Sequence, residues 1–196
     1  ENLVPPVVDA GPTATLTCQN TSISLSATGS SPLGGTVNFA WTGVSIVTGA
    51  NSANPVVSQP GQYNVLITSQ LNGCTAMDSV SVLADVNLPT AAIALPATLT
   101  CLVKQTILDA SNGTTTGTNI SYSWSTTNGS IVSKNGLSAT VNKPGDYQLL
   151  VTNSATGCSA TANTTVIEDT APPAAIATRR RPCVRSSRPA AATSRP

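Results

Sequence analysis

Short runs in which apolar and polar residues alternate recur along the whole chain. Residues 22–27, 63–68 and 147–152 place an apolar side chain at every second position, which is the period of a half-buried β-strand. Residue pairs that favour tight turns, such as Gly34-Gly35 and Asn72-Gly73, separate these runs. No segment has the period of an amphipathic helix. The pattern predicts an all-β protein made of short antiparallel strands.

The same order of landmarks occurs twice in the chain. Each half has a cysteine after Thr-Leu-Thr, then a tryptophan, a tyrosine shortly after Pro-Gly, and a cysteine after a glycine. These landmarks are Cys18, Trp41, Tyr63 and Cys74 in the first half, and Cys101, Trp124, Tyr147 and Cys158 in the second. The offset between the copies is 83 residues up to the tryptophan and 84 from the tyrosine onward. One residue has therefore been inserted in a loop, and the halves are predicted to be homologous domains.

The repeat predicts the domain organisation. We expect two tandem Ig-like (PKD-like) antiparallel β-sandwich domains, residues 1–85 and 86–169, joined by a short proline-containing linker that makes a semi-rigid rod. Residues 170–196 begin an incomplete third repeat, because 172–177 match 89–94, and then continue as an irregular basic Pro/Arg/Ala tail. This tail has two interpretations: a disordered basic end with affinity for anionic surfaces, or the product of a frameshift or gene-fragment end.

Four of the cysteines fall at equivalent places in the two repeats. A small domain buries a modest core, so a covalent cross-link would stabilise it. Pairing within each repeat, Cys18 with Cys74 and Cys101 with Cys158, is the symmetric choice that lets each domain fold alone. Each such bond would join an early edge strand to the final strand and would contribute ~3–4 kcal/mol by the chain-entropy model. The alternative is four reduced thiols that pack as small hydrophobic groups.

Composition narrows the classes of function. Charged residues make up 9% of the chain and the net charge is +1, which argues against a nucleic-acid binder. The chain has no histidine, so the commonest general base and transition-metal ligand are absent. Asp9, Asp85 and Asp169 could bind calcium near the domain joint, but they are isolated, which favours solvated linker residues. No apolar run reaches the ~18 residues of a membrane span. We predict no enzyme activity, no catalytic residue, no metal site and no cofactor.

The tryptophans and the tyrosines of the repeat are predicted to be internal. Each tryptophan lies within an alternating run, as expected of a residue on the inner face of a central strand. Carbohydrate stacking by the tryptophans is the alternative. The predicted core positions are Trp41, Tyr63, Trp124 and Tyr147.

Together these motifs resemble a known family of repeats. In the first copy they are VDAG at 8–11, LTC at 16–18, Trp41, PGQYNV at 60–65 and GCTA at 73–76. This succession is similar to the PKD-like, cysteine-bearing tandem repeats of large secreted and cell-surface proteins of gliding, Bacteroidetes-type bacteria. The resemblance covers residues 4–169. It implies an Ig-like sandwich, export from the cell, service as a spacer or adhesive stalk, and no catalytic residues.

The same resemblance implies sites for covalent glycans. Bacteria of this group attach O-glycans at an Asp followed by Ser or Thr and then an apolar residue. Asp78-Ser79-Val80 and Asp169-Thr170-Ala171 are similar to that pattern, which makes Ser79 and Thr170 candidate O-glycosylation sites. Chance matches in a chain rich in serine and threonine are the alternative.

The third-repeat segment is predicted to make an intermolecular contact. Ile176 would add as part of an extra strand to the sheet edge of a neighbouring subunit, and Cys183 is left over from the paired set. The expected partners are other copies of the chain or neighbouring repeats, with possible covalent glycans, and no nucleic acid. We predict a non-catalytic, secreted structural module at the bacterial cell surface: a repeat segment of a stalk or adhesin, or a filament subunit. The alternative is an accessory polysaccharide-binding module of a secreted hydrolase.

Overall fold

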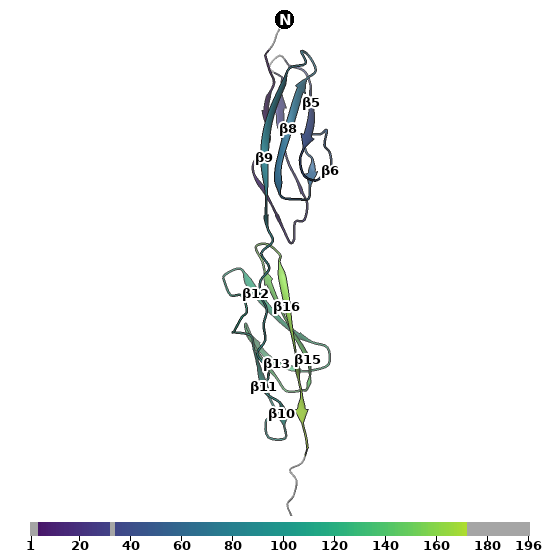
Figure 1. Cartoon of the computed structure of the whole chain (residues 1–196). Helices are drawn as coiled ribbons and strands as arrows, with labels where there is room; N and C mark the ends of the chain where they lie inside the picture. Colours follow the sequence, from purple (N-terminus) through teal and green to yellow (C-terminus); the bar gives the residue numbers. More distant parts are fainter. Residues whose placement is uncertain (1–3, 32–33, 172–196) are drawn as a thin grey trace, which may run out of the picture.

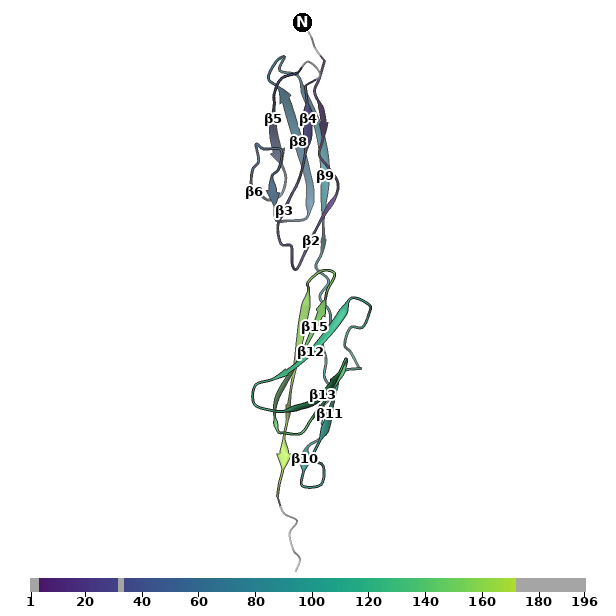
Figure 2. The same cartoon turned by 180° about the vertical axis from the view of Figure 1, so that it is seen from behind.

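The computed structural model describes residues 4–31 and 34–171 as two β-sandwiches placed end to end (Figures 1 and 2). Every regular element in these residues is a strand, and none is a helix. The first sandwich lies at the N-terminal end of the rod, and the second continues it along the same axis. The predicted all-β fold with two tandem sandwiches is confirmed. The predicted tail lies outside the described residues.

The first sandwich has three sheets. The largest follows the order β2-β9-β8-β5 and consists of β2 (Ala14–Thr17), β9 (Thr75–Asp85), β8 (Gly61–Ser69) and β5 (Val37–Thr42). The second follows the order β3-β7-β6 and consists of β3 (Ile23–Ser24), β7 (Val56–Val57) and β6 (Ile46–Thr48). The third pairs β1 (Val7–Asp9) with β4 (Thr28–Ser30). All pairs are antiparallel except β2 with β9, which run parallel.

The second sandwich repeats this plan. One sheet has the order β12-β15-β16, with β12 (Ile120–Thr126), β15 (Gly145–Asn153) and β16 (Ser159–Val166). The other has the order β11-β14-β13, with β11 (Thr106–Asp109), β14 (Ser138–Val141) and β13 (Ile131–Asn135). The short strand β10 (Leu99–Thr100) runs parallel to β17 (Glu168–Asp169), which follows β16 after one residue. These two strands are the counterparts of β2 and the end of β9.

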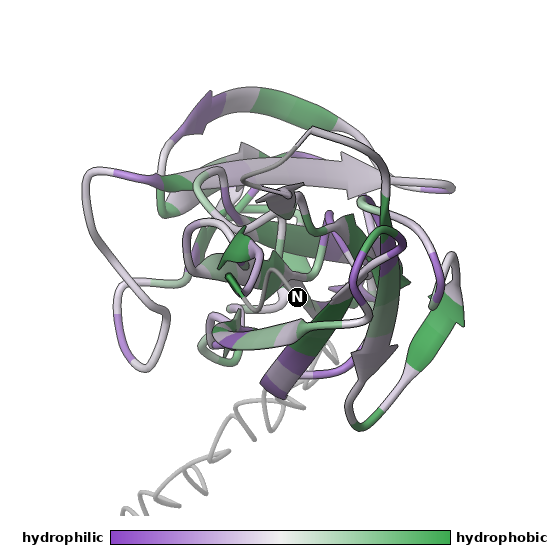
Figure 3. Cartoon of the chain, turned by 90° about the horizontal axis from the view of Figure 1, so that it is seen from above, coloured by the Kyte–Doolittle hydropathy of each residue, from purple (hydrophilic) through white to green (hydrophobic). Residues whose placement is uncertain are grey.

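Each sandwich has its own core, built from the inward side of the alternating strands. In β8 the side chains of Tyr63, Val65 and Ile67 are fully buried, and β15 buries its equivalent residues in the same way. Trp41 and Trp124 lie in the same two cores and are 4% and 2% exposed. Figure 3, which looks along the rod, shows hydrophobic stretches on the strands and paler loops around them. Burying a large apolar side chain contributes roughly 1.5–3 kcal/mol, so the alternation accounts for most of the driving force.

The hydroxyl groups of the buried tyrosines and the indole N–H groups of the buried tryptophans have equivalent hydrogen-bond partners in the two domains. The Tyr63 hydroxyl donates to the carbonyl of Gln59 at 2.8 Å, and the Tyr147 hydroxyl donates to the carbonyl of Lys143 at 2.7 Å. Each partner lies four residues earlier, in the corner that leads into the strand, which is the arrangement known as a tyrosine corner in Ig-like sandwiches. The indole N–H groups of both tryptophans likewise donate to backbone carbonyls at 3.0 Å. These partners are needed because a buried unsatisfied donor is costly.

The two domains differ in how the first segment of each sandwich is held in place. The first domain pairs β1 with β4 through a backbone ladder. In the second domain threonine side chains bridge the equivalent segments: the Thr114 hydroxyl donates to the carbonyl of Ala92 and accepts from its N–H, both at 3.0 Å. The Thr115 hydroxyl likewise accepts from the N–H of Thr90 at 2.8 Å, and the Thr115 N–H donates to the carbonyl of Thr90 at 3.1 Å. The second copy is also the less faithful one in sequence at this place.

Candidate functional site

The two domains are joined by a disulfide. Cys18 of the first domain is bonded to Cys158 of the second, and the other two cysteines among the described residues, Cys74 and Cys101, are free thiols. The predicted pairing of Cys18 with Cys74 and of Cys101 with Cys158 is therefore wrong. The bond does not close a loop within either sandwich but connects them across the linker.

The parallel strands explain why pairing within a repeat is excluded. Thr17 at the end of β2 lies opposite Asp85 at the end of β9. Cys18, the next residue, therefore lies near the C-terminal end of β9. Cys74 immediately precedes the other end of that strand, which is 11 residues long. Eleven residues of strand span about 36 Å, whereas a disulfide needs Cα atoms within about 7 Å.

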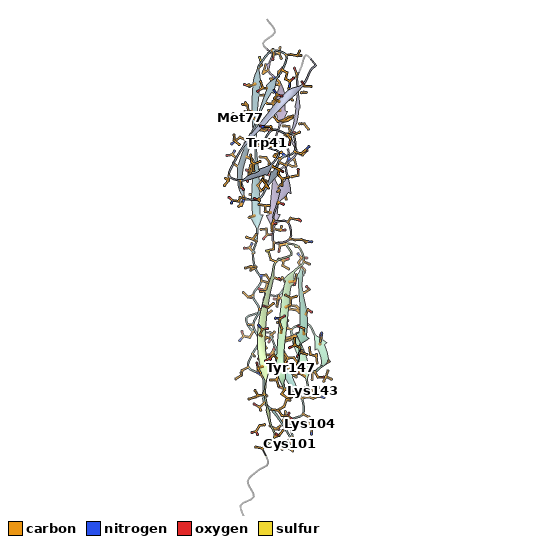
Figure 4. All side chains as sticks on the ribbon, turned by 90° about the vertical axis from the view of Figure 1, so that its right-hand side faces the viewer. Trp41, Met77, Cys101, Lys104, Lys143 and Tyr147 are labelled. Atoms are coloured by element: carbon orange, nitrogen blue, oxygen red, sulfur yellow. A yellow bond between two sulfur atoms is a disulfide. The ribbon has the colours of Figure 1, made fainter. Side chains whose placement is uncertain are left out.

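The second domain has the same geometry. Leu99 of β10 lies opposite Glu168 of β17, so Cys101 lies at the far end of the rod, as Figure 4 shows. Cys158 immediately precedes β16, at the end of the domain that faces the joint. The early edge strand β2 does lie beside the final strand β9, but the predicted bond between them does not form. The cysteines that flank these strands lie at opposite ends of the domain.

Two preformed pieces of backbone meet at the joint, and we call them the cysteine turn (residues 17–20) and the cysteine hairpin (residues 153–158). The N–H of Gln19 in the turn donates to the carbonyl of Thr156 in the hairpin at 3.1 Å. Gly157 has a φ of +72°, and a Cβ on it would lie only 2.7 Å from the Cβ of Gln19. Cys158 is fully buried and Thr156 is 4% exposed. The turn therefore packs tightly on the hairpin, and glycine permits both the backbone conformation and the approach.

Local hydrogen bonds shape both pieces before they meet. Within the cysteine turn, the N–H of Thr17 donates to the carbonyl of Asn20 and the N–H of Asn20 donates to the Thr17 hydroxyl, both at 3.0 Å. Within the cysteine hairpin, the N–H groups of Asn153 and Gly157 donate to the carbonyls of Cys158 and Asn153, both at 2.8 Å. The joint therefore has its geometry set in advance, which lowers the entropy lost when the two pieces meet. Sequence reasoning missed this joint, although the repeated Thr-Cys and Gly-Cys pairs were its signal.

A groove lies on the outer face of β12, β15 and β16. It has a volume of about 530 Å³ and is lined mainly by polar side chains, Asp146, Gln148, Asn163 and Thr165 among them. The Thr165 hydroxyl at 2.7 Å and the Asn128 amide at 3.2 Å donate to the carboxylate of Asp146. These donors, Thr165 first, lower the pKa of Asp146. The Asp146 carboxylate therefore accepts hydrogen bonds in a network on the sheet face, and it is not a proton donor near neutral pH.

None of the aromatic side chains forms an exposed platform for a sugar ring. All six aromatic residues lie within the described ranges. The predicted core residues Trp41, Tyr63, Trp124 and Tyr147 are 4% exposed or less. Phe39 and Tyr122 are half-buried and pack against the two cores. Within residues 4–31 and 34–171, no group of three or more Asp, Glu or Cys side chains is placed to hold a metal ion.

The predicted glycosylation residues lie on the surface. Ser79 is exposed on β9, and its hydroxyl accepts a hydrogen bond from the Gln62 amide at 3.1 Å. The neighbouring Asp78 accepts from the N–H of Ala10 at 2.7 Å, and this bond is the main cause that lowers the pKa of Asp78. Thr170 is exposed beyond β17. Ile176 and Cys183, predicted to make an intermolecular contact, lie outside the described residues.

Comparison with known proteins gives one family match, over the second half of the chain. Residues 86–167 match the family model of the PKD domain. No curated protein matches the chain by sequence. Among solved structures, an I-band fragment of titin is similar at 16% identity and a TM-score of 0.38, covering 86% of this chain and 67% of that one. The human desmocollin-1 ectodomain is similar at 12% identity and a TM-score of 0.36, covering 89% and 39%.

A further similar structure contains the N-terminal eight Ig domains of the Down syndrome cell adhesion molecule. Its identity is 13% and its TM-score 0.45, covering 83% of this chain and 27% of that one. These likenesses concern the fold alone. The family match places a PKD domain over residues 86–167. Across the described residues, no helix has the length and apolar character needed to cross a membrane.

Proposed function

We propose that this chain is a non-catalytic extracellular structural module. It serves as a repeat segment of a bacterial surface stalk or adhesin, or as a subunit of an extracellular filament. In this proposal residues 1–85 and 86–169 are the two repeat units, and residues 170–196 begin the next one. Its partners are neighbouring repeats or other copies of the same chain, and Ser79 and Thr170 carry covalent glycans.

The observation that carries this proposal is the joint. A linker alone would let two sandwiches swivel, because interdomain contacts within a chain are normally small. Here the Cys18–Cys158 bond adds a second covalent connection beside the linker, and the Gln19–Thr156 hydrogen bond ties the same surfaces. Two connections between bodies resist bending far better than one. Such a joint is useful to a spacer, and disulfides of this kind persist in oxidising, extracytoplasmic compartments.

The surface of the chain gives less support to the alternative of a polysaccharide-binding accessory module. Such modules use exposed aromatic faces, and all six aromatic side chains of this chain are buried or half-buried. The groove on β12, β15 and β16 is the place where a polar ligand would bind. A glycan array tests this directly: specific binding that is lost in Gln148→Ala would favour the accessory module over the spacer.

The two free thiols allow a direct test of the spacer role. In a Cys183→Ser background, fluorescent dyes on Cys74 and Cys101 report the length of the rod by energy transfer. The strands β9 and β15 have 11 and 9 residues, so two sandwiches end to end place the dyes roughly 60–70 Å apart. We expect a single, narrow distance distribution at that separation.

Replacement of the joint provides the control. In Cys18→Ala/Cys158→Ala the mean dye separation should fall modestly and the distribution should broaden, because one of two connections is lost. A distribution in the parent chain as broad as in this variant would contradict the spacer role. A compact arrangement would do so as well, since a compact chain of this length has a radius of gyration of only ~16 Å.

A further inference from the structure

Each end of the rod carries an unjoined copy of one half of the central joint. Cys101 lies in a second cysteine turn (residues 100–103) at the end of the second domain. Cys74 lies in a second cysteine hairpin (residues 69–74) at the outer end of the first domain. The central joint consists of the other turn and the other hairpin. The structure therefore contains one complete joint and the two complementary halves of another.

The two cysteine turns have the same internal hydrogen bonds. In residues 100–103 the N–H of Thr100 donates to the carbonyl of Val103 at 2.9 Å, and the N–H of Val103 donates to the Thr100 hydroxyl at 3.0 Å. Both bonds reproduce those of residues 17–20 to within 0.1 Å. The second turn is thus already folded in the form that binds a hairpin. Its Cys101 is exposed, and Leu102, which occupies the position of Gln19, is 95% exposed.

The two cysteine hairpins also have the same geometry. In residues 69–74 the N–H groups of Ser69 and Gly73 donate to the carbonyls of Cys74 and Ser69, both at 2.9 Å. The φ of Gly73 is +71°, against +72° for Gly157. Gly157 meets Gln19, whereas at Gly73 no described atom other than those of residues 72–74 lies within 4 Å of the Cβ position. The space beside the hairpin glycine, which Gln19 fills at the central joint, is open at Gly73, and the Asn72 amide next to it donates to the carbonyl of Val4 at 3.0 Å. Cys74 is half-buried where Cys158 is fully buried.

We propose that Cys74 and Cys101 are inter-repeat disulfide sites whose partner is the complementary half-site of another repeat of this kind. Cys101 bonds the cysteine hairpin of the repeat that follows, and Cys74 bonds the cysteine turn of the repeat that precedes. The contact is head-to-tail and does not close on itself, so it extends the rod in both directions. This inference deepens the proposed spacer function and rests on it.

The bond forms by thiol–disulfide exchange with a disulfide-bonded oxidant such as oxidised glutathione. The thiolate of Cys101 attacks the oxidant and displaces one thiol, and the thiolate of the other copy's Cys74 then attacks the mixed disulfide and displaces the second. Two cysteine S–H groups are lost and one S–S bond forms. The two protons and two electrons leave with the two thiols released from the oxidant.

Cross-linking of the full chain tests the proposal. In a Cys183→Ser background, the concentrated protein is oxidised with oxidised glutathione and separated without reductant, and the cross-linked peptides are identified by mass spectrometry. Random pairing would make Cys74–Cys101 bonds as abundant as the two homotypic bonds together. We expect an excess on the order of tenfold, because a preference of about 1.4 kcal/mol from the matching surfaces suffices, and a ladder of linear oligomers.

Single variants distinguish complementary pairing from random oxidation. Cys74→Ser alone and Cys101→Ser alone should each remain monomeric, since each lacks one half-site, whereas their mixture should give a dimer and nothing larger. Homotypic dimers that form from either single variant as fast as the dimer forms from the mixture would overturn the proposal, and so would thiols that stay reduced in the parent. If such a result accompanies a narrow dye separation, the inference fails while the spacer role stands; a broad separation would remove both.

A glycine substitution checks that the surfaces, and not only the thiols, decide the pairing. Gly73→Ala places a methyl group where the incoming turn must pack, as the 2.7 Å approach at Gly157 shows. Gly136→Ala adds the same left-handed backbone strain, at a φ of +55°, in a turn with open space around it. We expect several-fold slower cross-linking for Gly73→Ala and the parent rate for Gly136→Ala. Equal rates for the two variants would show that no fitted surface guides the bond.

Discussion

The cysteine hairpins at residues 69–74 and 153–158 are nearly identical pieces of backbone in different surroundings. Both close with the same hydrogen bonds and both turn at a glycine with φ near +70°. One is covered by the neighbouring domain, and its cysteine is fully buried and bonded. The other is not covered by a second domain of the described chain, and its cysteine is a half-buried thiol. The comparison shows that each repeat folds its half of the joint by itself, and that the neighbour decides whether it is used.

The largest expected difference between the two repeats comes from creating a cavity in the core of one of them. Trp124→Ala should lower the free energy of unfolding of the second domain by about 3–5 kcal/mol, because it leaves a large cavity beside buried residues. Each domain has one tryptophan, so the fluorescence of Trp41 reports the first domain separately while circular dichroism follows both. Trp41→Ala is the matched variant for the other core. An equal loss in both domains from one substitution would mean that they unfold as a single unit.

Removal of the central disulfide should lower the free energy of unfolding of the second domain by somewhat less than the loss of its tryptophan. With the first domain folded, Cys18 lies beside Asp85, so the bond closes a loop that runs from the linker to Cys158. By the chain-entropy model this stabilises the second domain by up to about 4 kcal/mol. Urea unfolding of Cys18→Ala/Cys158→Ala measures the loss. Cys74→Ala, which removes the equivalent but unbonded cysteine, should stay within ~0.5 kcal/mol of the parent.

A pair of glycine substitutions separates strain within a hairpin from strain in the joint. Gly73→Ala and Gly157→Ala both force a side chain into the left-handed region, which costs roughly 1–2 kcal/mol at either site. Only Gly157→Ala also brings a methyl group against Gln19. We expect similar losses of domain stability in thermal unfolding but a broader dye separation for Gly157→Ala alone. Equal dye distributions would contradict the tight packing at the joint.

The smallest expected difference between the two domains is in how their stability changes with pH in acid. Asp78 accepts from the N–H of Ala10, and its pKa in the folded state is lowered chiefly by that bond. A depressed folded pKa stabilises the first domain above the unfolded pKa, and this contribution is lost as pH falls through the folded value. The equivalent position in the second domain is Ala162. Asp78→Asn should therefore lower the stability of the first domain near neutral pH and leave the second unchanged, with the gap to the parent closing in acid. A gap that persists at low pH would show that the carboxylate charge is not responsible.

The repeat landmarks predicted much of this architecture from particular residues. The alternation in 63–68 and 147–152 identified the central strands β8 and β15, whose inward side chains form the two cores. The register between the copies predicted two tandem sandwiches. The disulfide prediction failed because it assumed that equivalent cysteines pair within a repeat. The domain boundaries and the glycosylation residues Ser79 and Thr170 stay predictions.

The sequence by itself determined the strands, the duplication and the residues that form each core, because period and turn chemistry are local properties of the chain. Only the tertiary structure decided which cysteines meet. An edge strand has the same alternation whether it joins its neighbour in parallel or antiparallel orientation, so the direction of β2 against β9 is not readable from residues 14–17. That direction places Cys18 and Cys74 at opposite ends of one domain and brings Cys18 to Cys158 of the next.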